Sequence, residues 1–180
     1  PSQGNTADAP ESDIARRDRI VAQNLASVNT RDFGKGTRNS GGIFQITPAG
    51  VIGWYYNLNP FSTTSNNGNG DGSNPQGGLM QAADGYLYAT ASGGGTNATA
   101  GGVVFKIATN GTGYSVVHNF QSAEGTAPHG GLVQGSDGYL YGLTTNNGPP
   151  TTINGAPPLT MWGTLFKVST TGTNYTVLIP

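Results

Sequence analysis

Two aspartates are the residues of this chain whose type and spacing come closest to a catalytic arrangement. Asp84 and Asp137 each stand directly before a glycine and lie 53 residues apart. Two carboxylates that face each other about 5–10 Å apart across a cleft can hydrolyse a glycosidic bond. Asp-Gly between two runs of alternating apolar residues is also a hairpin signal, and turn chemistry accounts for both aspartates. We therefore expect Asp84 and Asp137 to shape turns.

The two histidines, His118 and His129, offer no repeated catalytic or metal-binding pattern. In the repeat described below, counting along the sequence matches His118 with Asn57 and Ile179, and His129 with Gln76. The chain has no cysteine, which excludes disulfides and thiolate metal sites. It also lacks the nucleophile elbow, the HExxH motif and the P-loop. We expect a protein that is not an enzyme.

One stretch resembles the start of a calcium-binding loop. Asn67, Asn69 and Asp71 fall at positions 1, 3 and 5 of such a loop, followed by a glycine at position 6. Position 12 is Gly78 instead of glutamate, and only Asp71 carries a charge. The pattern predicts weak calcium binding at most, and the competing interpretation is a surface loop without a metal. Calcium is the only cofactor that the sequence suggests.

Aromatic and asparagine residues raise the question of sugars. Aromatic rings that stack on sugars would come from Trp54, Tyr55, Tyr56 and Trp162, although aromatic residues at alternating strand positions more often belong to a core. N-x-S/T triplets, which are acceptors for N-linked glycans, begin at Asn97, Asn110 and Asn174.

The elements that position these residues come from an internal repeat. The stretches GGIFQITPAG, GGVVFKIATNG and WGTLFKVSTTG place Phe44, Phe105 and Phe166 at intervals of 61 residues. Each phenylalanine is followed by a polar residue and then by Ile or Val, which is the period of a β-strand. A second alternating stretch follows each copy, so each copy predicts a pair of strands joined by a turn.

A second repeated pair of strands completes a four-stranded unit. Residues 71–88 align without gaps to residues 124–141. Two complete sets of strands are predicted: 78–82, 86–91, 102–108 and 114–120, then 131–135, 139–144, 163–168 and 174–179. Four antiparallel strands recurring every 50–60 residues are typical of β-propeller blades. We expect an all-β repeat domain over 41–180, with a half unit at 41–60 and full units at 71–122 and 124–180.

The stretches PHGGLVQGSDGYLYGLTT with GTLFKVSTTG, and PQGGLMQAADGYLY with GGVVFKI, carry a family resemblance. They resemble the Gloeo/Verruco repeat of exported bacterial proteins, over about 41–180. This resemblance implies secretion and a propeller-like fold but no shared activity. The chain departs from the pattern at Ala89 and Trp162, where glycines are expected.

Residues 1–40 fall outside the repeat and form an N-terminal arm. Ile14, Val21, Leu25 and Val28 follow a roughly helical spacing, which predicts a helix over 11–27. The alternative is an extended arm that donates a strand to the open edge of a neighbouring copy.

The composition and the first residue of the chain bear on its binding partners and its location in the cell. Charged residues make up 9% of the chain and the net charge is −1 with no basic stripe, so we expect no nucleic-acid binding. No apolar run approaches the roughly 20 residues of a membrane span. Because the chain begins with Pro1 instead of Met, we expect a signal peptide to have been removed. The expected location is extracellular or at the bacterial cell surface.

The number of units bears on function. The sequence supplies two and a half to three blades, whereas closed propellers have about 4–8. A smaller set leaves strand edges that pair readily with another chain. We expect a structural protein that self-assembles with copies of itself, through open β edges and the N-terminal arm, into a fibre or surface layer. The alternative is a carbohydrate-binding or adhesive module.

Overall fold

The structure is a computed structural model that describes residues 20–23, 40–46, 49–58, 70–96, 101–146, 148 and 163–179. All of the regular structure in these ranges is β-strand, arranged in three antiparallel sheets. The predicted all-β fold with repeated antiparallel units is therefore confirmed, and the sheets do not close into a ring. No membrane-spanning helix occurs within the described ranges.

The first sheet has the order β1-β2-β3 and corresponds to the predicted half unit. It consists of β1 (Ile20–Gln23), β2 (Gly42–Ile46) and β3 (Ile52–Asn57). The helix predicted over 11–27 is wrong at β1, which pairs antiparallel with β2 of the same chain. The β-branched residues Ile20 and Val21 favour an extended backbone, and the edge of β2 supplies the hydrogen bonds that a strand needs.

The second and third sheets are the two full units. The second sheet contains β4 (Ser73–Pro75), β5 (Met80–Gln81), β6 (Leu87–Gly93), β7 (Val103–Ile107) and β8 (Ser115–Asn119). The third contains β9 (Thr126–Gln134), β10 (Leu140–Asn146), β11 (Leu165–Val168) and β12 (Tyr175–Ile179). Their orders are β4-β6-β7-β8, with β5 also paired to β6, and β12-β11-β10-β9. The eight strands that the sequence predicted all form.

The two full units match pair for pair in their strand register. Tyr88 lies opposite Lys106 in the second sheet, as Tyr141 lies opposite Lys167 in the third. The next row along the same face runs across three strands of each sheet. In the second sheet Val104 lies between Thr90 and His118. In the third sheet Leu165 lies between Leu143 and Ile179. Each position in one sheet therefore has a defined counterpart in the other.

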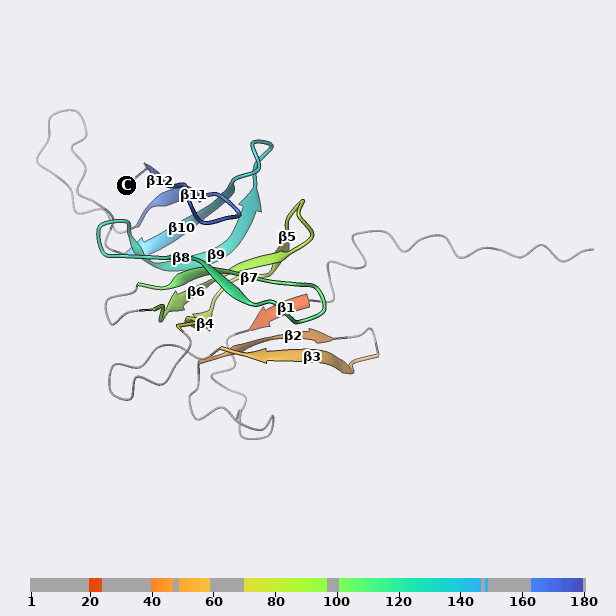
Figure 1. Ribbon diagram of the computed structural model, residues 1–180. Coiled ribbons are helices and arrows are strands. Elements are labelled where there is room, and N and C mark those ends of the chain that lie inside the picture. Colours follow the sequence, from red (N-terminus) through yellow and green to blue (C-terminus); the bar gives the residue numbers. More distant parts are fainter. Residues whose placement is uncertain are drawn as a thin grey trace, which may run out of the picture.

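The three sheets lie as successive layers, with the first sheet at one end and the third at the other (Figure 1). Because side chains of a strand alternate between its two faces, the second sheet contributes to a core on both sides. Towards the first sheet it turns Ala89 and Phe105, which cluster with Ile43 and Leu58. Strand alternation thus produces two cores from one sheet.

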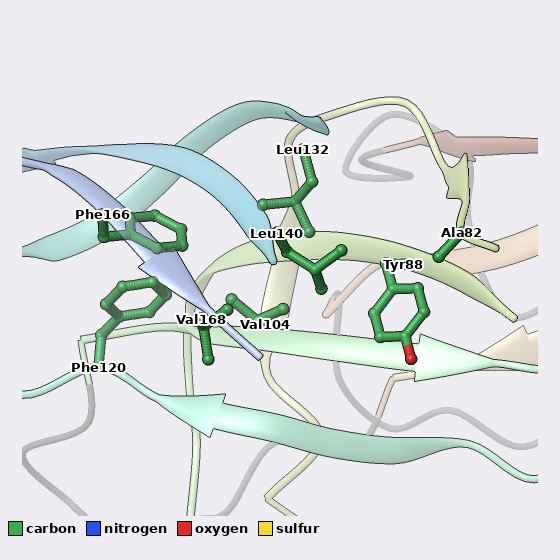
Figure 2. Close-up of a cluster of buried hydrophobic side chains, with 8 residues drawn as sticks. All are labelled: Ala82, Tyr88, Val104, Phe120, Leu132, Leu140, Phe166 and Val168. Atoms are coloured by element: carbon green, nitrogen blue, oxygen red, sulfur yellow. The ribbon is translucent and has the colours of Figure 1, made fainter. Parts of the chain in front are cut away.

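The other core lies between the second and third sheets, where Tyr88 and Val104 face the third sheet. Its buried members are Ala82, Tyr88, Val104, Phe120, Leu132, Leu140, Phe166 and Val168. Figure 2 shows Leu140 and Val104 at the centre of this cluster, with Phe120 and Phe166 at one end and Tyr88 at the other.

Candidate functional site

The repeated Asp-Gly-Tyr-Leu-Tyr motif is a turn braced by its aspartate. The carboxylate of Asp84 accepts hydrogen bonds from the main-chain N–H of Tyr86 at 3.1 Å and from the hydroxyl of Tyr88 at 2.6 Å. Asp137 accepts the same two bonds from Tyr139 and Tyr141, at 3.2 and 2.7 Å. Gly85 and Gly138 in these turns have φ values of 85° and 82°, which favour glycine. Both aspartates shape turns, as the sequence indicated.

The remaining residues of the motif also have defined contacts. Lys106 lies 4.9 Å from the centre of the Tyr86 ring, and Lys167 lies 4.6 Å from that of Tyr139, so each first tyrosine holds a cation–π contact. The leucine between the two tyrosines is buried in both copies. The hydrogen bond from Tyr141 holds the pKa of the Asp137 carboxyl below its usual range. The motif recurs because it builds the same braced hairpin twice.

A cluster of polar and aromatic side chains, the first joint, connects the first sheet to the second. The rings of Tyr56 and Tyr114 stack with centroids 4.5 Å apart and planes 8° apart. The hydroxyl of Tyr56 donates to a carboxylate oxygen of Asp71 at 2.9 Å, and the hydroxyl of Tyr114 donates to the main-chain carbonyl of Asp71. Burial, together with the Asp71 charge, raises the pKa of both tyrosines. Both hydroxyls therefore stay protonated and serve as donors.

The second joint, between the second and third sheets, repeats this construction with different residues. The rings of His118 and Tyr175 stack with centroids 4.1 Å apart and planes 2° apart. His118 Nε2 lies 3.1 Å from Glu124 Oε2, and the hydroxyl of Tyr175 donates to the main-chain carbonyl of Glu124 at 3.0 Å. Burial lowers the pKa of His118, while the Glu124 carboxylate acts in the opposite direction.

The two joints place an aromatic ring, an acidic residue and a tyrosine in the same arrangement. Asp71 and Glu124 occupy matching positions in the ungapped alignment, and this pair was the signal in the sequence that could have revealed the joints.

The match of His118 with Asn57, which counting along the 61-residue repeat predicted, is wrong. In the sheets Ile43 pairs with Tyr56 where Val104 pairs with His118. A register irregularity lies between Val104 and Phe105 and has no equivalent between Ile43 and Phe44. It shifts the count by one residue, so that Tyr56 is the counterpart of His118.

The structure places some of the predicted site residues in these joints. Asp71, the third residue of the calcium-loop pattern, is 4% exposed and its carboxylate binds Tyr56; Asn67 and Asn69 lie outside the described residues. No group of three or more potential metal ligands occurs in the part of the chain that the structure describes. Calcium binding stays a prediction.

Trp54 lies in the contact between the first sheet and the turn that precedes β8. Its Nε1 donates to the carbonyl of Thr109 at 2.9 Å. A Cβ atom on Gly111 would lie 2.5 Å from the indole ring, so glycine is required for this approach. Tyr55 is half-buried and lies opposite Phe44 in the ladder, whereas Trp162 lies outside the described residues. Stacking of these three side chains on sugars stays a prediction.

The remaining candidates fall on turns or outside the described ranges. Asn110 and Asn174 are both exposed, in the turns before β8 and β12, and Asn97 lies outside the described residues. Among the residues assigned to an assembly arm, Val21 lies in β1, and Ile14, Leu25 and Val28 fall outside the described ranges.

The outer face of the third sheet, defined by Val133, Tyr141, Leu143, Leu165 and Ile179, is apolar and exposed. Val133, Leu143 and Ile179 are 66, 55 and 58% exposed. Their counterparts in the second sheet are Met80, Thr90 and His118, and Thr90 is only 1% exposed because the third sheet covers it. The uncovered face is also the more apolar one, with Leu143 in place of threonine and Ile179 in place of histidine.

These features define a repeat protein whose four-stranded units pack on one another through repeated joints. The Gloeobacter/Verrucomicrobia repeat matches residues 29–180 of the chain. The chain belongs to this repeat family, which confirms the resemblance seen in the sequence; the match begins before residue 41, where the repeat domain was expected to start. No curated protein matched the chain.

Proposed function

We propose that this chain is a non-enzymatic structural protein outside the bacterial cell, whose copies assemble through their open surfaces into a fibre or surface layer. The observation that carries the proposal is the outer face of the third sheet. Three of its apolar side chains are more than half exposed, and the same positions one repeat earlier are packed under a neighbouring sheet. Contiguous exposed apolar patches on soluble proteins mark interaction sites.

The energetics support a contact at this face. Burying a Val, Leu or Ile side chain fully stabilises a structure by about 1.5–3 kcal/mol. Val133, Leu143 and Ile179 retain more than half of this area for a partner. With 9% charged residues and a net charge of −1, like copies repel one another weakly. Burial therefore has little electrostatic repulsion to overcome.

Open strand edges and the N-terminal arm would extend the contact. The third sheet ends in β12 on one side and β9 on the other, and the first sheet ends in β1 and β3. Edge strands present unpaired main-chain groups that pair with strands of another chain. Since β1 already pairs with β2 of its own chain, the arm would contribute through residues other than 20–23. Secretion is what the resemblance to exported repeat proteins implies.

The oligomeric state tests this proposal. Light scattering after size-exclusion chromatography, together with negative-stain electron microscopy, should show species well above the 18.4 kDa of one chain. Leu143→Lys, which places a charge in the outer face, should shift the population towards monomer. Ala123→Lys adds the same charge at an exposed turn residue outside this face and should leave assembly unchanged. A wild-type chain that stays monomeric over the whole concentration range would refute the proposal.

A carbohydrate-binding or adhesive module is the second candidate. It is supported by Tyr86, which is 37% exposed and recurs as Tyr139 in the next repeat. A lysine already lies over each of these rings, which leaves less of the ring for a sugar. Reproducible binding on a glycan array, lost in Tyr86→Ala, would favour this alternative.

A further inference from the structure

The segment that connects the second sheet to the third is held by Glu124. Its carboxylate oxygen Oε2 lies 3.1 Å from His118 Nε2 and accepts a hydrogen bond from the main-chain N–H of Gln121 at 3.2 Å. Its main-chain carbonyl accepts hydrogen bonds from the hydroxyls of Tyr175 at 3.0 Å and Thr164 at 3.2 Å. Glu124 therefore ties the connecting segment to β8 of the second sheet and to β12 of the third.

The two joints differ in whether a stacked ring can gain a charge in mild acid. The counterpart of His118 in the first joint is Tyr56. Burial and the Asp71 charge raise the pKa of Tyr56 above its ordinary 10.0, so this ring stays neutral in acid. His118 is the ring of the second joint that can be protonated; its side chain is 12% exposed and lies flat on Tyr175. Only the second joint therefore places a titratable imidazole between two sheets.

The groups around His118 act on its charge in opposite directions. Burial lowers the pKa of His118 below its ordinary 6.5, against the opposite effect of the Glu124 carboxylate. The hydroxyl of Tyr175 stays neutral because burial raises its pKa. On β7, Lys106 lies on the same face as Val104, the residue opposite His118, and its ammonium is held over another tyrosine ring. In an open joint His118 would be in water and would bind a proton more readily, so a fall in pH favours opening.

We propose that the second joint is a pH-sensitive hinge: protonation of His118 loosens the third sheet from the second at residues 121–125, while the first joint stays closed. Each sheet keeps its strands, because the main-chain ladders lie within the sheets. Opening uncovers Val104 on the second sheet and Phe166 on the third, which are fully buried in the closed joint (Figure 2). Mild acid would thus expose further apolar surface. This inference concerns a single chain and does not depend on the proposed self-assembly.

Two main-chain amides at matching repeat positions report on the two joints separately. The N–H of Ala127 donates to the carbonyl of Gly101 across the second joint at 2.6 Å, and the N–H of Asn74 donates to that of Ser40 across the first joint at 2.9 Å. Ala127 and Asn74 match in the ungapped alignment and share a φ of 53°. Because an amide exchanges its hydrogen with solvent when its hydrogen bond opens, the exchange rate measures the opening of each joint.

Hydrogen exchange detected by NMR, on the full chain at a concentration where it is monomeric, tests the hinge. Each rate is divided by that of an unstructured peptide at the same pH, which removes the effect of pH on the exchange chemistry. Between about pH 7.5 and about pH 5.5, the protection of Ala127 should fall at least threefold, while that of Asn74 should change less than twofold. Equal losses at both amides would show that the whole chain loosens, and a gain at Ala127 would show that acid tightens the joint. Either result overturns the proposal.

Three variants assign the effect to His118. His118→Phe keeps a ring in the stack that cannot be protonated, so the loss of protection at Ala127 in acid should disappear. His129→Gln replaces the exposed histidine by the residue of its repeat counterpart, Gln76, and should keep the loss in full. Glu124→Gln removes the carboxylate that favours the protonated imidazole and should move the loss to lower pH, which tests the hinge even if His118→Phe fails to fold. A loss that persists in His118→Phe, that disappears in His129→Gln or that keeps its pH in Glu124→Gln would refute the role of His118.

Discussion

Replacing Phe166 by alanine should destabilise the chain strongly, because this side chain lies between two sheets. Phe166 is fully buried, and its ring lies 5.0 Å from that of Phe120 and 5.7 Å from that of Tyr175. The position of a Cβ on Gly142 would lie 2.6 Å from the Phe166 ring, so the main chain packs directly against it. Because residue 142 is a glycine, it has no side chain that could move into the space left by a smaller residue at position 166.

The magnitude follows from the lost transfer free energy and the cavity that remains. Truncation of a buried phenylalanine to alanine typically costs about 3–5 kcal/mol. We expect Phe166→Ala in the upper half of this range, because Gly142 beside the ring has no side chain to fill the cavity. The matched control is Phe44→Ala, at the same repeat position in the first sheet but half-buried. Since it removes less buried area, it should cost roughly half as much in the monomer.

Urea denaturation followed by tryptophan fluorescence gives the free energy of unfolding for each variant at a protein concentration where the chain is monomeric. Phe166→Leu provides an intermediate variant if the alanine variant fails to fold, with an expected cost of about 1–2 kcal/mol. A loss of less than about 1 kcal/mol for Phe166→Ala, or an equal loss for Phe44→Ala, would contradict the packing of the third sheet on the second.

Three further predictions concern the turns and joints. Tyr88→Phe removes the hydroxyl that braces the Asp-Gly turn and should cost about 1 kcal/mol in chemical denaturation without changing the secondary structure seen by circular dichroism. Because burial keeps the pKa of His118 below its ordinary 6.5, protonation favours the unfolded chain. Stability should therefore fall as the pH drops below 6.5, and the His118→Phe variant should lose this part of the pH dependence while it keeps a ring in the stack. Gly111→Ala should destabilise the chain more than Gly113→Ala: both have positive φ, which costs alanine about 1–2 kcal/mol, but only the former brings a methyl group against Trp54. Equal melting temperatures for the two alanine variants would contradict the contact between Trp54 and the turn.

Much of the fold could be predicted from the sequence because its signals are local. The alternation around Phe105 and Phe166 and the Asp-Gly turns predicted eight of the nine strands of the two full units, and β4 was not predicted. The segment containing β1 was mistaken for a helix, because four apolar residues follow a helical spacing and the preference for a strand depends on a partner edge distant in the sequence. The joints escaped prediction since one irregularity in strand register displaces Tyr56 by one residue from the position that counting gives.

The sequence alone determined that this chain repeats a braced hairpin and a phenylalanine strand, because periodicity of two and turn chemistry act between neighbouring residues. Only the tertiary structure decided which face of each sheet is covered. Thr90 and Leu143 occupy the same repeat position, yet the first is buried and the second is more than half exposed, because only the second sheet has another sheet packed over it. That difference depends on the packing of residues far apart in the chain, which no local pattern encodes.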